Sequence, residues 1–182
     1  IVWGIFAQDL AGGATRRVSV SSSGNQANSE SRWPRLSDDA RFVLFTSAAS
    51  NLVADDTNPG YDFFVRDLVA GTTTQVSHPS SGTELSQRGS ISSDGRFVAY
   101  SSTRTDLGSE APAGTLQVFL HSLVTQTTIL VSVSATGESG NNRSYSPSLS
   151  ADGKLVAFQS QASNLVSGDT NGVSDIFVFE RP

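Results

Sequence analysis

The chain has 182 residues, 37% of them hydrophobic, which is enough to bury a sizeable core. Twelve basic and 17 acidic residues give a net charge of −5, so nucleic acid is not an expected partner. There is no cysteine for a disulfide or a thiolate site, and no apolar run long enough to predict membrane insertion. The chain also lacks methionine, even at position 1, from which we expect a processed form or a fragment.

An apolar segment that recurs four times sets the organisation of the chain. It reads IVWGIFAQDL at 1–10, FFVRDL at 63–68, LQVFLHSL at 116–123 and DIFVFE at 175–180. Its phenylalanines Phe6, Phe64, Phe119 and Phe177 follow one another at steps of 58, 55 and 58 residues. Because the other landmarks keep these steps, the chain is predicted to be a repeat array.

Each of the first three copies is followed by a second, more polar strand. These strands read TRRVSV, TTQVSH and TILVSV, and each places a valine 12 residues after its phenylalanine. Their alternation is incomplete, which is typical of strands near a sheet edge. A polar loop of variable length then leads to a short third strand that ends at Leu36, Ile91 or Leu149.

A tight turn and a fourth, strongly apolar strand complete the repeat. The turns SDDAR, SSDGR and SADGK favour hairpins, since Asp bonds its own backbone and Gly accepts positive φ. The strands that follow, RFVLF, RFVAY and KLVAF, are apolar on successive residues, which predicts burial on both faces. A radial stack of sheets buries its middle strands in this way.

The sequence therefore predicts an all-β fold of β-propeller blades, each with four antiparallel strands. The array 1–182 holds about three blades: the last two strands of one blade in 1–32, whole blades in 33–87 and 88–146, and the first three strands of another in 147–182. Residues 14–20 or a neighbouring chain would complete the final blade. The array is then part of a larger propeller, half of a six-bladed ring of two chains, or the unit of a filament.

The repeated S-x-D-G-[RK]-[FL]-V-[AL]-[FY], followed by S-x-x-S-N-L-V and D-T-N-[GP]-x-x-D-[IF]-F-V, resembles the TolB-like β-propeller repeats of bacterial envelope and secreted proteins. The resemblance implies a six-bladed, periplasmic or secreted propeller. It also implies a non-catalytic module that binds or scaffolds a protein or glycan ligand. Two alternatives stay open: a subunit that self-assembles through unfinished blades, and the propeller portion of a glycan- or peptide-active enzyme.

The D-T-N loops contain the candidate metal ligands, oxygen-bearing side chains with the same spacing in two copies. These are Asp56, Asn58, Asp62, Asp169, Asn171 and Asp175. Oxygen ligands on a short loop suit Ca²⁺, the one cofactor that the sequence indicates. The other interpretation is that these side chains cap the turn through hydrogen bonds. The middle copy, STRTDLGSEAPAGTLQVFL, lacks the segment, which favours turn capping.

Two histidines and three aromatic residues complete the candidates. His78 and His121 occupy different repeat positions, so we expect structural roles for both and no catalytic residue. Trp3, Trp33 and Tyr61 lie at or near strand ends. Exposed, they would stack on a sugar or a peptide; packing between blades is the expected role, because large aromatic side chains are mostly buried.

Overall fold

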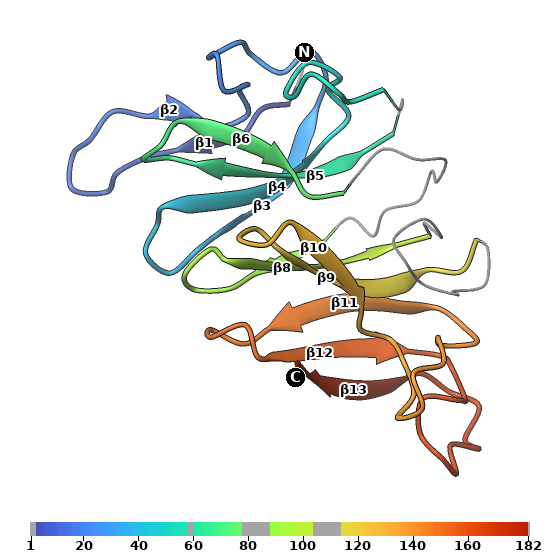
Figure 1. Cartoon of the computed structure of the whole chain (residues 1–182). Helices are drawn as coiled ribbons and strands as arrows, with labels where there is room; N and C mark the ends of the chain where they lie inside the picture. Colours follow the sequence, from blue (N-terminus) through green and yellow to red (C-terminus); the bar gives the residue numbers. More distant parts are fainter. Residues whose placement is uncertain (1–2, 58–59, 78–87, 104–113, 182) are drawn as a thin grey trace. The chain divides into compact units, whose positions relative to one another are not determined.

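The computed structural model describes residues 3–57, 60–77, 88–103 and 114–181. The chain divides into two compact units, residues 1–79 and 80–182, and each is described by itself. Within the described residues every regular element is a strand and every strand pairing is antiparallel (Figure 1). The all-β prediction is confirmed. No membrane-spanning helix is found in the part of the chain that the structure describes.

The first unit contains a two-stranded and a four-stranded sheet. The small sheet pairs β1 (Phe6–Ala7) with β2 (Arg16–Arg17). The large sheet has the order β3 (Ser31–Leu36), β4 (Phe42–Ser47), β5 (Asp62–Asp67) and β6 (Thr72–Gln75). The polar strand β6 lies at a sheet edge, as its incomplete alternation predicts.

The second unit contains a four-stranded and a three-stranded sheet. The first is built from β7 (Ser90–Ile91), β8 (Phe97–Ser102), β9 (Gln117–Ser122) and β10 (Thr127–Leu130). The second is built from β11 (Ser144–Leu149), β12 (Leu155–Ser160) and β13 (Asp175–Glu180). In chain order the sheets have two, four, four and three strands, as the repeat predicts; the exact blade ranges stay a prediction.

A stacked aromatic pair joins the second and third strands of each larger sheet. The pairs are Phe45–Phe64, Tyr100–Phe119 and Phe158–Phe177, with ring centroids 5.8–5.9 Å apart and planes within 26–29°. In every case the two residues are direct cross-strand partners. Such pairs stabilise a sheet beyond the burial of their area.

The apolar core of the second unit lies between its two sheets. Val118 and Leu120 of β9 belong to one cluster with Val156 and Phe158 of β12. In the first unit, Ile5 before β1 packs in the same way with residues of β4 and β5. The middle strands β4 and β8 are buried from their second residue onward, which confirms the prediction of burial on both faces for these two. The prediction is wrong for β12, where burial alternates along the strand and Leu155 is exposed.

A buried serine closes the outer edge of three sheets, and the sequence reasoning did not single it out. Ser77 Oγ accepts a hydrogen bond from Phe63 N at 2.9 Å, and Ser132 Oγ accepts one from Val118 N at 3.0 Å. Ser19 Oγ does the same for Ile5 N at 3.1 Å. The sequence contains a signal for this serine, because a Val-Ser pair recurs at 18–19, 76–77 and 131–132 with the spacing of the repeat.

A β-bulge interrupts the first strand of two sheets. The register shifts between Arg32 and Arg35 in β3, and between Tyr145 and Ser148 in β11. The residues at corresponding bulge positions, Trp33 and Ser146, have φ of 49° and 52°. A bulge was not predicted, because neither segment has a glycine to mark a left-handed residue.

Candidate functional site

The D-T-N loop of the second unit is pinned by its own side chains. Asn171 Nδ2 donates to Asp175 Oδ2 at 2.8 Å, and Asn171 Oδ1 accepts from Val173 N at 2.9 Å. Both polar groups of Asn171 are thus engaged inside the loop, which is the geometry of a capped turn. Asp169 lies half-buried in the same loop.

The corresponding loop of the first unit is described only in part. Asp56 and Asp62 are buried, and Asp62 Oδ1 accepts from Ser77 Oγ at 2.8 Å, whereas Asn58 lies outside the described residues. No three His, Cys, Asp or Glu side chains among the described residues gather as a metal site. Calcium also takes amide and backbone oxygens, so calcium binding at these loops stays a prediction.

The S-N-L-V segments form a clasp between two loops. Asn28 N donates to Asn51 Oδ1 at 2.9 Å, and Ser50 N donates to Asn28 Oδ1 at 3.0 Å. Asn51 Nδ2 completes the clasp by donating to Gln26 O at 2.8 Å. The same contacts recur at Asn141, Ser163 and Asn164. The role of this part of the motif is therefore structural.

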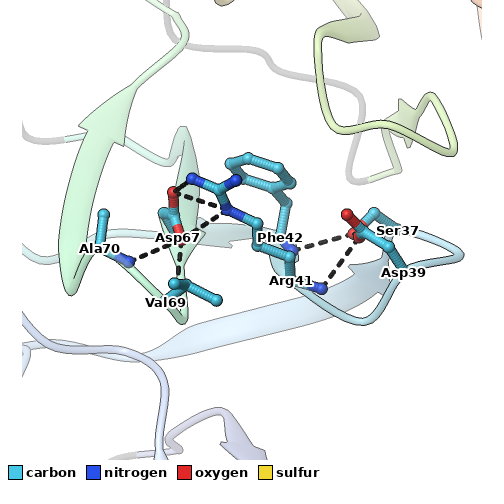
Figure 2. A network of polar contacts seen from close by, with 7 residues as sticks. All are labelled: Ser37, Asp39, Arg41, Phe42, Asp67, Val69 and Ala70. Carbon is cyan, nitrogen blue, oxygen red and sulfur yellow. Dashed lines mark hydrogen bonds and ion pairs between the residues drawn. The ribbon is translucent and has the colours of Figure 1, made fainter.

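The Asp-containing turns fix the hairpin between the first two strands of a sheet. In the turn before β4, Ser37 Oγ donates to Asp39 Oδ1, which also accepts from Arg41 N at 3.0 Å (Figure 2). These hydrogen bonds, the one from Ser37 most of all, lower the pKa of Asp39. The corresponding carboxylate, Asp152, has a lowered pKa for the same reason, with Ser150 as its donor.

An ion pair joins this turn to the end of β5. Arg41 Nη2 lies 2.6 Å from Asp67 Oδ2, and the Arg41 guanidinium lies 4.8 Å from the centroid of the Phe42 ring (Figure 2). Asp67 Oδ1 also accepts from Val69 N and Ala70 N at 2.8 and 2.9 Å. The hydrogen bonds from Arg41 are the main reason that the pKa of Asp67 falls to about 2.

His121 has a structural position, as expected. Its side chain is fully buried in β9, and its Nδ1 lies 2.9 Å from Thr128 Oγ1 on the neighbouring β10. A general base has to reach a substrate proton, so a fully buried ring in a sheet does not suit that role. His78 lies outside the described residues.

An aromatic groove is the feature least explained by the repeat. Residues 3–6 and 31–34 line a cavity of about 620 Å³, which we call the Trp3–Trp33 groove. The expectation that the aromatic residues pack between blades is wrong for Trp3, which is 70% exposed. Trp33 and Tyr61 are half-buried, with ring centroids 6.4 Å apart.

Two guanidinium groups lie beside this groove. Arg32 lies 5.6 Å from the Trp33 centroid and 5.9 Å from that of Tyr61, and it forms an ion pair with Glu30. Arg17, on β2, lies over the Phe6 ring at 4.6 Å. None of the residues that line the groove carries a carboxylate. The groove thus combines aromatic faces with positive charge, which suits an anionic ligand with an apolar face.

Comparison with known proteins identifies the fold but no family: no family model matches the chain, and no curated protein matches it. Among solved structures, TolB from Acinetobacter baumannii matches 97% of this chain and 35% of its own, at 17% identity and a TM-score of 0.56. The chain has the fold of a partial β-propeller.

Structures of enzymes match as well. A structure of prolyl endopeptidases has a TM-score of 0.59 at 16% identity, covering 97% of this chain and 24% of that one. An oligogalacturonate lyase in complex with manganese has a TM-score of 0.56 at 13% identity, covering 100% and 42%. The chain thus spans less than half the length of these three structures, and likeness at this level of identity concerns the fold alone.

We predict that Asp67→Asn lowers stability at neutral pH but not in strong acid. The folded pKa of about 2 lies below the reference value of 3.8, so the charged form stabilises the fold above pH 4, and this contribution is lost as the pH falls toward 2. The Arg41 side chain is 45% exposed, so we expect a loss on the order of 1 kcal/mol. Urea unfolding between pH 2 and 7 measures it.

The exposed Asp55 supplies the control for this experiment, because it makes no ion pair among the described residues. Asp55→Asn should follow the wild type over the whole pH range. A constant difference between Asp67→Asn and the wild type from pH 7 to pH 2 would contradict the ion-pair explanation.

Calcium binding at the D-T-N loops predicts a higher Tm in millimolar Ca²⁺ than in chelator, because a ligand specific to the folded state stabilises it. Asn171→Ala should reduce that rise if Asn171 turns its Oδ1 to the ion, while the loop of the first unit keeps its own candidate ligands. Differential scanning calorimetry of both proteins decides the question. An identical Tm in Ca²⁺ and in chelator would leave turn capping as the role of these loops.

Proposed function

We propose that this chain belongs to a non-catalytic β-propeller, periplasmic or secreted, that binds a protein or glycan ligand. The observation that carries the proposal is the Trp3–Trp33 groove, which contains an exposed tryptophan and Arg32 in its lining, with Arg17 beside it over the Phe6 ring. Exposed aromatic and arginine side chains are the residues that dominate recognition sites.

The placement of the polar side chains supports a binding role over a catalytic one. Ser132 Oγ donates to Gln117 Oε1 at 2.6 Å while it accepts from Val118 N, so its hydroxyl is committed to the sheet. The described aspartates of the turns act in the same way on neighbouring amides. An activated nucleophile needs a base and an orienting group beside it, and these serines have backbone partners instead.

We expect the purified chain to bind at least one member of a panel of polysaccharides and peptides without turning it over. Native gels containing each polysaccharide and fluorescence anisotropy of labelled peptides measure binding, while reducing-end release and fluorogenic peptide cleavage measure turnover. Cleavage that persists in independent preparations would show the enzyme alternative to be correct.

A second candidate, self-association through unfinished blades, is favoured by the outer face of β13. Ile176 and Val178 on this face are 72% and 64% exposed. Their repeat counterparts on β9, Val118 and Leu120, lie in the core that β12 helps to cover. The β13 face therefore has the composition of a surface that receives a further blade, and we propose a second copy of this chain as the occupant.

Self-association predicts that the mass measured by light scattering rises with protein concentration. Val178→Lys should shift the protein toward monomer, because burying an unpaired ammonium is unfavourable. The control is Val124→Lys, an equally exposed valine in the turn before β10, which should leave the mass unchanged. A constant monomer mass over a hundredfold range of concentration would exclude this candidate.

A further inference from the structure

Each unit contains the same backbone junction between two segments. A side chain that differs between the two junctions is therefore not required by the fold. In the first unit the segment before β1 meets the start of β3, where Ser31 N donates to Trp3 O at 2.8 Å. In the second unit Ser144 N donates to Leu116 O at 2.7 Å at the corresponding positions. The backbone arrangement is therefore shared, and differences between the junctions lie in their side chains.

The junction of the second unit is filled. Leu116 is buried, and the fully buried Gln117 donates through Nε2 to Gly140 O and Asn142 O at 2.9 and 3.2 Å. Pro147 of β11 is buried as well. A leucine and a satisfied amide thus occupy the space between the segments, as expected of a purely structural contact.

The junction of the first unit is open at the same positions. Trp3 stands at the position of Leu116 and is exposed. Gly4 stands at the position of Gln117 and has no side chain that could fill the junction. A Cβ on Gly4 would lie 2.5 Å from Arg17 Nη1, so the glycine lets the guanidinium lie close against this backbone. Together these changes leave the Trp3–Trp33 groove.

The backbone does not account for tryptophan at position 33. Both Trp33 and Ser146 have left-handed φ, so the bulge requires this conformation in either unit. A left-handed φ is unfavourable for a bulky side chain, and serine satisfies the same bulge in β11. The bulge therefore does not require a large aromatic side chain here. Trp33 contacts Tyr61 and Arg32, and because its ring is only half-buried, the rest of the ring is open to a ligand.

The chemistry of the groove selects an anionic sugar. Trp3 and Trp33 offer flat aromatic surfaces for the C–H face of a sugar ring. Arg17 has no carboxylate partner among the described residues, so its guanidinium is available to a ligand carboxylate, with which arginine pairs in bidentate geometry. The volume of about 620 Å³ lies within the roughly 300–1,000 Å³ usual for ligand sites.

A peptide added as an extra strand would lack one of its partners at this junction, because Ser31 N already donates to Trp3 O. Side-chain stacking and charge are what the groove offers, and a glycan with carboxylate groups uses both. We propose that the Trp3–Trp33 groove binds a uronic-acid-containing glycan, an inference that rests on the proposed binding function and names its ligand class.

Binding to polygalacturonate and to its highly methyl-esterified form tests the charge, because the two polymers share a backbone and differ in free carboxylates. In native affinity gels we expect polygalacturonate to retard the wild type, and the esterified polymer to bind at least tenfold more weakly. Equal retardation by both polymers, or none by polygalacturonate, would overturn the inference. The proposed function would survive either result if another member of the panel bound without turnover.

Variants locate the site. Trp33→Ser installs the residue that stands at the same bulge in β11, so we expect a folded protein and at least a tenfold loss of affinity. Arg17→Gln should remove most of the preference for the unesterified polymer. The matched control, Ser146→Asn, changes the bulge of the other unit and should bind like the wild type. Wild-type affinity in a folded Trp33→Ser would place the site elsewhere and overturn the inference, and the circular dichroism spectrum verifies folding.

Discussion

The stacked aromatic pair between the second and third strands of each larger sheet is the contact on which the rest depends. Phe45 and Phe64 are cross-strand partners, and so are Tyr100 and Phe119. Each pair fixes the register of two central strands, and a slip of one residue would turn every apolar side chain to the opposite face. With the register set, the turn, the clasp and the closing serine fall at corresponding positions in those copies where the described residues show them.

Hydrogen bonds between side chains and backbone stabilise the strand ends and turns, which the aromatic pairs of the central strands do not reach. The strands are short, so many amides at their ends lack a strand partner, and Ser, Asn and Asp side chains supply the acceptors. This explains the high content of small polar residues in a chain without a recognisable catalytic motif. The abundance of serine reflects the large number of strand ends in a repeat of short strands.

The repeat in the sequence was sufficient to predict the strands, their order and the doubly buried strands β4 and β8, because these depend on local periodicity and spacing. It did not predict the alternating burial of β12, whose sequence KLVAF has the same apolar pattern. The bulge at Trp33 was beyond such reasoning, since nothing in the strand sequence SRWPRL, which has no glycine, marks a left-handed φ. Exposure of Trp3 was missed for a related reason: burial depends on what the neighbouring segments supply, and only the structure shows that Gln117 fills the junction of the second unit. The groove was thus not predictable from composition.

The left-handed residue of the first strand has a consequence for how such arrays diversify. Since Trp33 and Ser146 share one backbone conformation, this position accepts side chains of very different size without any change in strand register. Duplicated blades can therefore acquire separate chemistry one position at a time, while the aromatic pairs and closing serines stay constant. A propeller of this kind is a frame in which each blade can be reassigned to a new ligand independently of its neighbours.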